Sequence, residues 1–110
     1  MRFLEGLEAL GVQRAVLTSG DGLVIESTGK GSPGADLLAS ELVTIWKTMR
    51  VISTNLGGEI RRFTFATEHK EVLAVLHGTY CVGALIEKGN SRQAVGKELV
   101  QIAGRLAAEL

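Results

Sequence analysis

The sequence predicts an α/β domain of the α+β sandwich type, in which a five-stranded antiparallel sheet lies between one helix on one face and two helices on the other. Five apolar runs have the length of strands, and short links separate them as in antiparallel hairpins. Three stretches with helical spacing of apolar residues stand before, between and after these runs. The 110 residues predict a single domain, residues 1–110, large enough to bury about two-thirds of its unfolded surface.

The first 27 residues predict a short helix followed by a β-hairpin. The helix covers about residues 2–10, and Gly11 suits a left-handed helix end. Strands follow at about 14–18 and 23–27, and the Gly20-Asp21-Gly22 segment between them predicts a tight turn. The apolar face of the helix consists of Phe3, Leu4, Leu7 and Leu10.

A long helix is predicted at about residues 33–56. Ser32 suits the N-terminal cap, Pro33 suits the first turn, and Gly57 with Gly58 ends the helix. Its apolar side chains cover an arc about 180° wide, whereas covering one sheet needs little more than about 100°. One stripe consists of Leu38, Leu42, Ile45, Met49, Ile52 and Leu56, and the adjacent stripe consists of Ala39, Val43 and Trp46.

Three strands and a last helix complete the expected fold. Strands at about 59–67, 72–77 and 80–86 are joined by short links. The second and third of these are apolar almost throughout, as expected of central strands covered on both faces. The last helix spans about 91–110, with Ser91 or Asn90 as its cap, and its apolar face consists of Val95, Leu99, Ile102, Leu106 and Leu110.

The segment from Gly11 to Ser27 resembles the start of a Roadblock/dynein light chain domain. That family has a recurring pattern: a Gly-Val pair, an apolar strand, an Asp-Gly turn and a second apolar strand that ends near a Ser. The matching positions in this chain are, in the same order, Gly11-Val12, residues 15–17, Asp21-Gly22, residues 23–25 and Ser27. Residues 71–76 and Gly83 resemble the family's paired C-terminal strands. Because the order of elements also agrees over nearly the whole chain, the resemblance implies a profilin-like sheet with strand order two, one, five, four, three.

Charge and cysteine content exclude several classes of function. Twelve Lys and Arg residues balance twelve Asp and Glu residues, so the chain lacks the basic excess that binds nucleic-acid phosphates. Cys81, the single cysteine, lies in an apolar run and is expected to be a buried small hydrophobic residue. With no signal peptide or membrane-spanning stretch in the sequence, we expect a cytoplasmic protein.

We expect no catalytic, cofactor-binding or metal-binding site. Residues 29–34 match Gly-x-Gly-x-x-Gly, but the preceding strand belongs to a hairpin and Pro33 removes an amide that phosphates would use, so a flexible loop is the interpretation. His69 and His77 have only Cys81 as a nearby soft ligand, which is too few donors for a metal ion. The sequence also lacks a phosphate loop ending in Gly-Lys-Ser/Thr, so we do not expect an enzyme that hydrolyses GTP or ATP.

Two features predict a homodimer. The surplus apolar face of the long helix needs a second surface, although Trp46 packing over the edge of its own sheet is the alternative. The resemblance implies that strand 59–67 is an edge strand, which in Roadblock proteins pairs antiparallel with its copy while the long helices pack side by side. The expected interface residues are Val43, Trp46, Arg61, Phe63 and Phe65.

The resemblance also implies a function. Roadblock proteins, including bacterial members of the MglB type, are non-enzymatic adaptors or scaffolds that bind a small Ras-like GTPase and modulate its nucleotide cycle or localisation. The expected contact residues flank the apolar arc near the helix end, although ordinary solvated residues are the alternative: Lys47, Arg50, Thr54 and Asn55. Longer MglB-type members continue beyond the last helix, which leaves stimulation of GTP hydrolysis open. A profilin-like small-molecule sensor module is the alternative function, which the dense aliphatic core disfavours.

Overall fold

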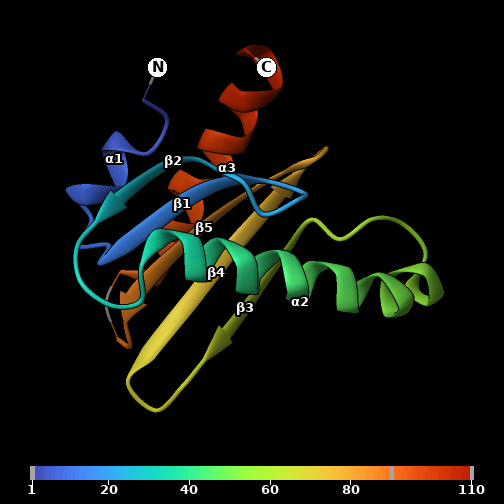
Figure 1. Cartoon of the computed structure of the whole chain (residues 1–110), viewed down its shortest axis with the longest axis horizontal. Helices are drawn as coiled ribbons and strands as arrows, with labels where there is room; N and C mark the ends of the chain where they lie inside the picture. The colour runs from blue at the N-terminus through green and yellow to red at the C-terminus, as the bar shows by residue number, and fades with distance from the viewer. Residues whose placement is uncertain (1, 90, 110) are drawn as a thin grey trace.

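A five-stranded antiparallel sheet carries one long helix on one face and two helices on the other (Figure 1). The computed structural model describes residues 2–89 and 91–109. The strand order is β2-β1-β5-β4-β3, and every neighbouring pair is antiparallel. In chain order the elements are α1 Glu5–Glu8, β1 Arg14–Ser19, β2 Val24–Gly29, α2 Ala35–Leu56, β3 Arg62–Ala66, β4 Lys70–His77, β5 Tyr80–Glu87 and α3 Arg92–Glu109. The predicted fold class and strand order are confirmed.

Each face of the sheet has its own hydrophobic core, because successive side chains of a strand point to opposite faces. On the α2 face, Leu42 lies so close over Gly83 that a Cβ there would come 2.3 Å from a Leu42 methyl carbon. On the other face, Leu7 of α1 and Leu99 of α3 are fully buried together with Leu17 of β1. The strands β4 and β5 contribute to both cores, as their continuous apolar sequences predicted.

Helix α1 is shorter than predicted, because only Glu5–Glu8 are helical. The residues before it are bound to β2 instead: the Glu26 carboxylate accepts hydrogen bonds from the backbone amides of Phe3, at 2.8 Å, and Leu4, at 2.7 Å. Arg105 of α3 donates to the Phe3 carbonyl oxygen at 3.1 Å. Phe3, Leu4 and Leu7 are buried as predicted, so the apolar face is right although the helix is not continuous.

The start of α2 also differs from the prediction. The helix begins at Ala35, its N-terminal cap is Gly34, and among the described side chains none caps it, so Ser32 and Pro33 do not have the predicted roles. The reason lies in the loop before it, where Arg14 donates to the carbonyl oxygens of Gly29, Gly31 and Pro33 at 3.0, 2.8 and 3.2 Å. This segment is therefore bound to β1, whereas a flexible loop was expected. At the other end α2 stops at Leu56 before the two glycines, as predicted.

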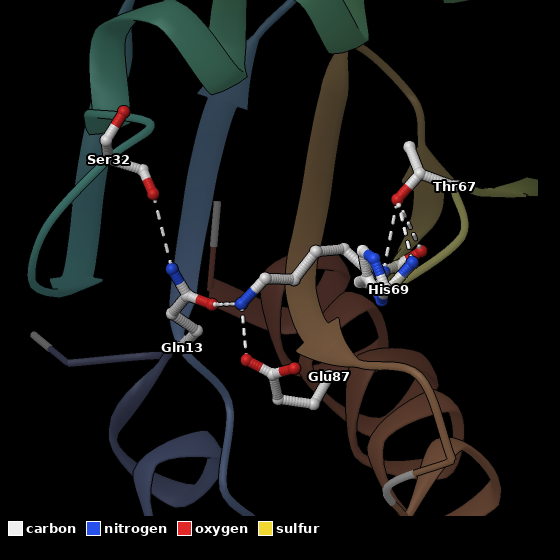
Figure 2. A network of polar contacts seen from close by, with 6 residues as sticks. Gln13, Ser32, Thr67, His69 and Glu87 are labelled. Carbon is white, nitrogen blue, oxygen red and sulfur yellow. Dashed lines mark hydrogen bonds and ion pairs between the residues drawn. The ribbon is translucent and has the colours of Figure 1, made fainter.

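A polar network connects β4, β5, the residue before β1 and the loop before α2 at one end of the sheet (Figure 2). The Lys70 ammonium group binds the Gln13 side-chain oxygen and the Glu87 carboxylate. The Gln13 side-chain nitrogen donates to the Ser32 carbonyl oxygen at 3.3 Å. In the turn between β3 and β4, the Thr67 hydroxyl accepts a hydrogen bond from the Lys70 amide at 3.1 Å. The lysine thus adds side-chain hydrogen bonds to strand ends that the backbone already pairs, since Lys70 lies opposite Glu87 and the Gln13 amide donates to the Leu85 carbonyl oxygen.

Helix α3 packs on β4 and β5 and also contacts α1. Its buried side chains include four of the predicted apolar face, Val95, Leu99, Ile102 and Leu106. The fifth, Leu110, lies outside the described residues, as does the candidate cap Asn90. Within the described chain, neither α2 nor α3 has an apolar stretch suited to crossing a bilayer.

A candidate partner-binding surface on α2 and β3

The C-terminal turns of α2 extend past the strands (Figure 1) and present uncovered apolar side chains. Val51 is 72% exposed, Ile52 56% and Leu56 80%. Burial along the helix ends at Trp46. Ile52 and Leu56 lie one helical turn apart, so they form a continuous apolar strip, and such strips mark interaction surfaces more often than isolated apolar residues do. The sequence placed Ile52 and Leu56 on the apolar arc, but it gave no signal for Val51.

Two of the predicted interface residues on α2 are buried within their own subunit. Trp46 is only 8% exposed and Val43 is buried beside it, in the core between α2 and the sheet. The interpretation that these residues form an uncovered face is wrong, and the alternative in which the indole packs on its own sheet is confirmed. The stripe that contains Val43 and Trp46 is covered because Phe63 of β3 and Ile60 ahead of that strand also pack on this core. The arc is uncovered at Ile52 and Leu56.

The edge strand β3 carries the rest of the predicted interface. Among the described strands it pairs only with β4, so one side of its backbone is free for further pairing. Phe65 is 40% exposed, whereas Phe63, on the same face, is buried. Arg61 lies just before the strand and is exposed, and its carbonyl oxygen accepts a hydrogen bond from the Leu76 amide at 2.8 Å. Phe65 and Arg61 are therefore the accessible members of the predicted set.

The predicted GTPase-contact residues Lys47, Arg50, Thr54 and Asn55 are all exposed on α2. The Arg50 guanidinium lies over the Trp46 ring, 5.8 Å from its centroid. The Thr54 hydroxyl donates to the Arg50 carbonyl oxygen at 2.9 Å, so its proton is used within the helix. Lys47, Arg50 and Thr54 share one side of the helix, whereas Asn55 points about 100° away from Thr54.

A hollow of about 300 Å³ lies between the α2 part and the β3 part of this surface. It lies between the end of α2 and the segment leading into β3 and brings Arg50 and Thr54 next to Arg61. Trp46 and Leu76 form its apolar side, and Glu59 contributes a carboxylate to the lining. Two arginines, one carboxylate and the hydroxyl groups of Ser53 and Thr54 suit recognition of another protein's polar side chains.

The turn between β1 and β2 lies close to Lys47. The Ser19 hydroxyl donates to the Asp21 carboxylate and the Leu23 amide donates to it at 3.0 Å, and these hydrogen bonds hold the pKa of Asp21 below its ordinary value. Lys47 adds a smaller electrostatic effect in the same direction. A charged carboxylate next to the first expected contact residue makes this end of the surface mixed in charge rather than purely basic.

Cys81 and His69 differ in burial and in the groups that lie beside them. Cys81 is fully buried, as predicted, and burial raises the pKa of its thiol to about 12. His69 is exposed and lies 3.4 Å from the Glu68 carboxylate, in the turn before β4. In the part of the chain that the structure describes, no three His, Cys, Asp or Glu side chains converge as metal ligands would.

Comparison with known families assigns the fold. The profile of the Roadblock/LC7 domain matches residues 4–85. The chain belongs to the Roadblock/LC7 family. This membership supports a regulatory adaptor. No curated protein sequence matches the chain significantly.

Solved structures of low sequence identity share the Roadblock fold. A Roadblock/LC7 domain from Streptomyces avermitilis has 20% identity and a TM-score of 0.86, with 96% of this chain and 92% of that chain aligned. The gliding protein MglB from Thermus thermophilus has 14% identity and a TM-score of 0.88, covering 96% and 84%. Profilin II from Acanthamoeba castellanii has 11% identity and a TM-score of 0.68, covering 94% and 90%. Identities this low establish a shared fold, and the expected likeness to profilin is confirmed.

Proposed function

We propose that this Roadblock/LC7 protein is a non-enzymatic adaptor that forms a homodimer and binds a small Ras-like GTPase, modulating its nucleotide cycle or localisation. The observation that carries the proposal is the uncovered apolar end of α2 beside the free edge of β3. Family membership supports the adaptor role, and the resemblance to MglB-type members supports a GTPase as the partner. Nucleotide hydrolysis belongs to that partner.

The dimer would form by antiparallel pairing of β3 with its copy. Such pairing satisfies the free backbone amides and carbonyls of the edge, and a two-fold axis uses the same surface twice. Phe65 lies on the edge strand and would lose its exposed area. Val43, Trp46 and Phe63 support this surface from inside the subunit, so the proposed interface consists of the β3 edge, Phe65, Arg61 and the apolar strip of Ile52 and Leu56.

The GTPase would bind to the outer side of α2. Lys47, Arg50, Thr54 and Asn55 supply charged and polar groups, and Val51, which is 72% exposed on the same side of the helix, supplies an apolar anchor. This combination of an apolar anchor, arginine and a polar rim is typical of protein interfaces. Because Arg50 rests on a buried ring, binding would lose less side-chain entropy there than at a free arginine.

The oligomeric state is tested by sedimentation equilibrium at micromolar concentration. We expect the mass of two chains for the wild type and of one chain for Phe65→Glu, because a charge on the edge strand cannot be buried between two copies. Leu23→Glu is the matched control, since Leu23 is exposed beside β2 at the opposite edge of the sheet, and it should leave the mass unchanged. A folded wild-type monomer at this concentration contradicts the dimer.

The partner is tested with small Ras-like GTPases from the same genome, immobilised after loading with a GTP analogue or GDP. We expect one of them to retain the wild-type protein in a nucleotide-dependent way, and Arg50→Glu to weaken retention by about tenfold, or about 1.4 kcal/mol, without changing the dimer mass. Lys30→Glu, an exposed cation outside α2, is the control. Failure of every GTPase in both nucleotide states to bind contradicts this part of the proposal.

A further inference from the structure

A second groove lies on the opposite face of the sheet from α2. Helix α3 packs on β4 and β5, and beside it a groove of about 580 Å³ opens toward the edge strand β3. A hollow of about 330 Å³ follows further along α3. We call the two together the α3–β3 groove, defined by Arg62, Thr64, Val75, Gly96, Lys97 and Val100.

The groove has the length and width to hold one helix beside α3. Its α3 wall is formed by residues spaced three or four apart, from Gln93 through Lys97 and Val100 to Gly104, so it runs beside α3 for about three turns, or roughly 16 Å. Gly96 and Gly104 have no side chain to fill it, and a Cβ at Gly104 would meet nothing within 4 Å. Packed helices lie about 8–10 Å apart, so a helix beside α3 would cover this part of the sheet.

Uncompensated positive charge lies on both walls of the groove. Lys97 stands on α3 and Arg62 on β3, and neither side chain has a hydrogen bond or ion pair with any described residue. Arg92 is different, because its guanidinium binds the buried Glu71 carboxylate at 2.8 Å. Val100, between the charged positions, is 49% exposed. In a chain of zero net charge, this groove therefore combines an apolar floor with two free cations.

We propose that the α3–β3 groove binds an amphipathic helix of a partner protein that carries acidic residues on both sides of its apolar stripe. The apolar stripe packs on Val75 and Val100, and carboxylates on its two flanks reach Arg62 and Lys97. We expect acidic residues on both flanks of the partner helix because Lys97 lies on the α3 side of the apolar floor and Arg62 on the β3 side. This surface is on the sheet face opposite α2, so its partner is separate from the proposed GTPase.

The proposal is tested by selecting a phage library of random 16-residue peptides on the full chain. We expect the enriched peptides to share acidic residues flanking a helical apolar stripe, and the strongest synthetic peptide to shift amide resonances along α3 and β3. Val100→Glu and Lys97→Glu should each raise its dissociation constant at least tenfold, whereas Leu37→Glu and Lys88→Glu, exposed elsewhere, should not. Replacing the peptide's glutamates by lysines should abolish binding, and salt should weaken it.

Three results would overturn the proposal: no enriched peptide, enriched peptides without the acidic pattern, or binding unaffected by the two groove substitutions. Binding of phosphatidylserine vesicles to the groove in place of any peptide would also overturn it. Unchanged circular dichroism spectra verify that the variants fold. The dimer mass and GTPase retention should not change in Val100→Glu, and Phe65→Glu should still bind the peptide, so failure here is distinct from failure of the proposed function.

Discussion

The Arg50 guanidinium carbon lies 5.8 Å from the centroid of the Trp46 indole, with the exposed cation over a ring that is buried in its own subunit. The ring is part of the α2-side core, and the cation is part of the proposed partner-binding surface. Trp46 therefore contributes to the stability of the fold, whereas Arg50 beside it is available to bind a partner. Substitutions at its two members should have different consequences.

Trp46→Ala should lower the free energy of unfolding by about 3–5 kcal/mol, because it removes a large buried side chain from the α2-side core. Urea unfolding followed by far-ultraviolet circular dichroism measures this, since the substitution removes the only indole. Arg50→Ala is the control and should cost only about 0.5–1 kcal/mol, the value of an exposed cation–π contact. A Trp46→Ala protein of wild-type stability and halved mass would instead place the indole in the interface.

Gly83→Ala should destabilise the protein by about 1–3 kcal/mol through overpacking. A Cβ at this position would come 2.3 Å from a Leu42 methyl carbon, so one of the two elements must move. Adding Leu42→Ala should cost less in the Gly83→Ala background than in the wild type, because the two side chains compete for the same space. Thermal unfolding of the four proteins measures this coupling, and strict additivity would contradict the close approach.

Gly104→Ala should stabilise the protein, in contrast to Gly83→Ala. The residue lies inside α3, and a Cβ there would meet nothing within 4 Å. Helix propensity alone therefore predicts a gain of about 0.5–1 kcal/mol. Thermal unfolding at fixed protein concentration measures it, and a loss of stability would show that α3 is packed more tightly than described.

Glu26→Gln should loosen the N-terminal segment. The carboxylate accepts the backbone amides of Phe3 and Leu4 with its two oxygens, whereas glutamine has one oxygen and would turn an N–H group toward one of these donors. The expected cost is about 1–3 kcal/mol, together with faster hydrogen exchange at these two amides. Glu41→Gln, on the exposed side of α2, should change neither quantity, and equal effects of both substitutions would contradict the anchoring role.

Local patterns predicted the elements well and their surroundings less well. The apolar runs of β4 and β5 predicted burial on both faces because strand periodicity is a local property. The start of α2 was wrong because Arg14, far away in sequence, binds the loop that was expected to supply the cap. Trp46 was misplaced because helical spacing gives the width of an apolar arc but does not say which distant residues, here Phe63 and Ile60, cover it.

The functional surfaces depend on the same long-range packing. The exposed end of α2 follows from how far the helix extends past the strands, which its length alone does not give. The α3–β3 groove depends on the lateral position of α3 over the sheet. The edge position of β3 came from the family resemblance, because strand order is not encoded in any single strand's sequence.

Cys81 should be unreactive toward a disulfide reagent such as dithionitrobenzoate in the native protein, and its labelling should follow global unfolding. Burial raises the pKa of its thiol from the ordinary value of 9.0 to about 12, so the thiolate that reacts is scarce in the folded state.

Because the folded pKa is the higher one, the contribution of the Cys81 thiol to stability is complete below pH 9.0 and is lost as the pH rises from there toward about 12. The free energy of unfolding should therefore fall with rising pH across that range, and Cys81→Ala should reduce this part of the slope. Thr79→Cys in the Cys81→Ala background is the reactive control, since Thr79 is exposed in the turn between β4 and β5. Rapid labelling of native Cys81 at pH 8 would show that the α2-side core opens without unfolding of the whole domain.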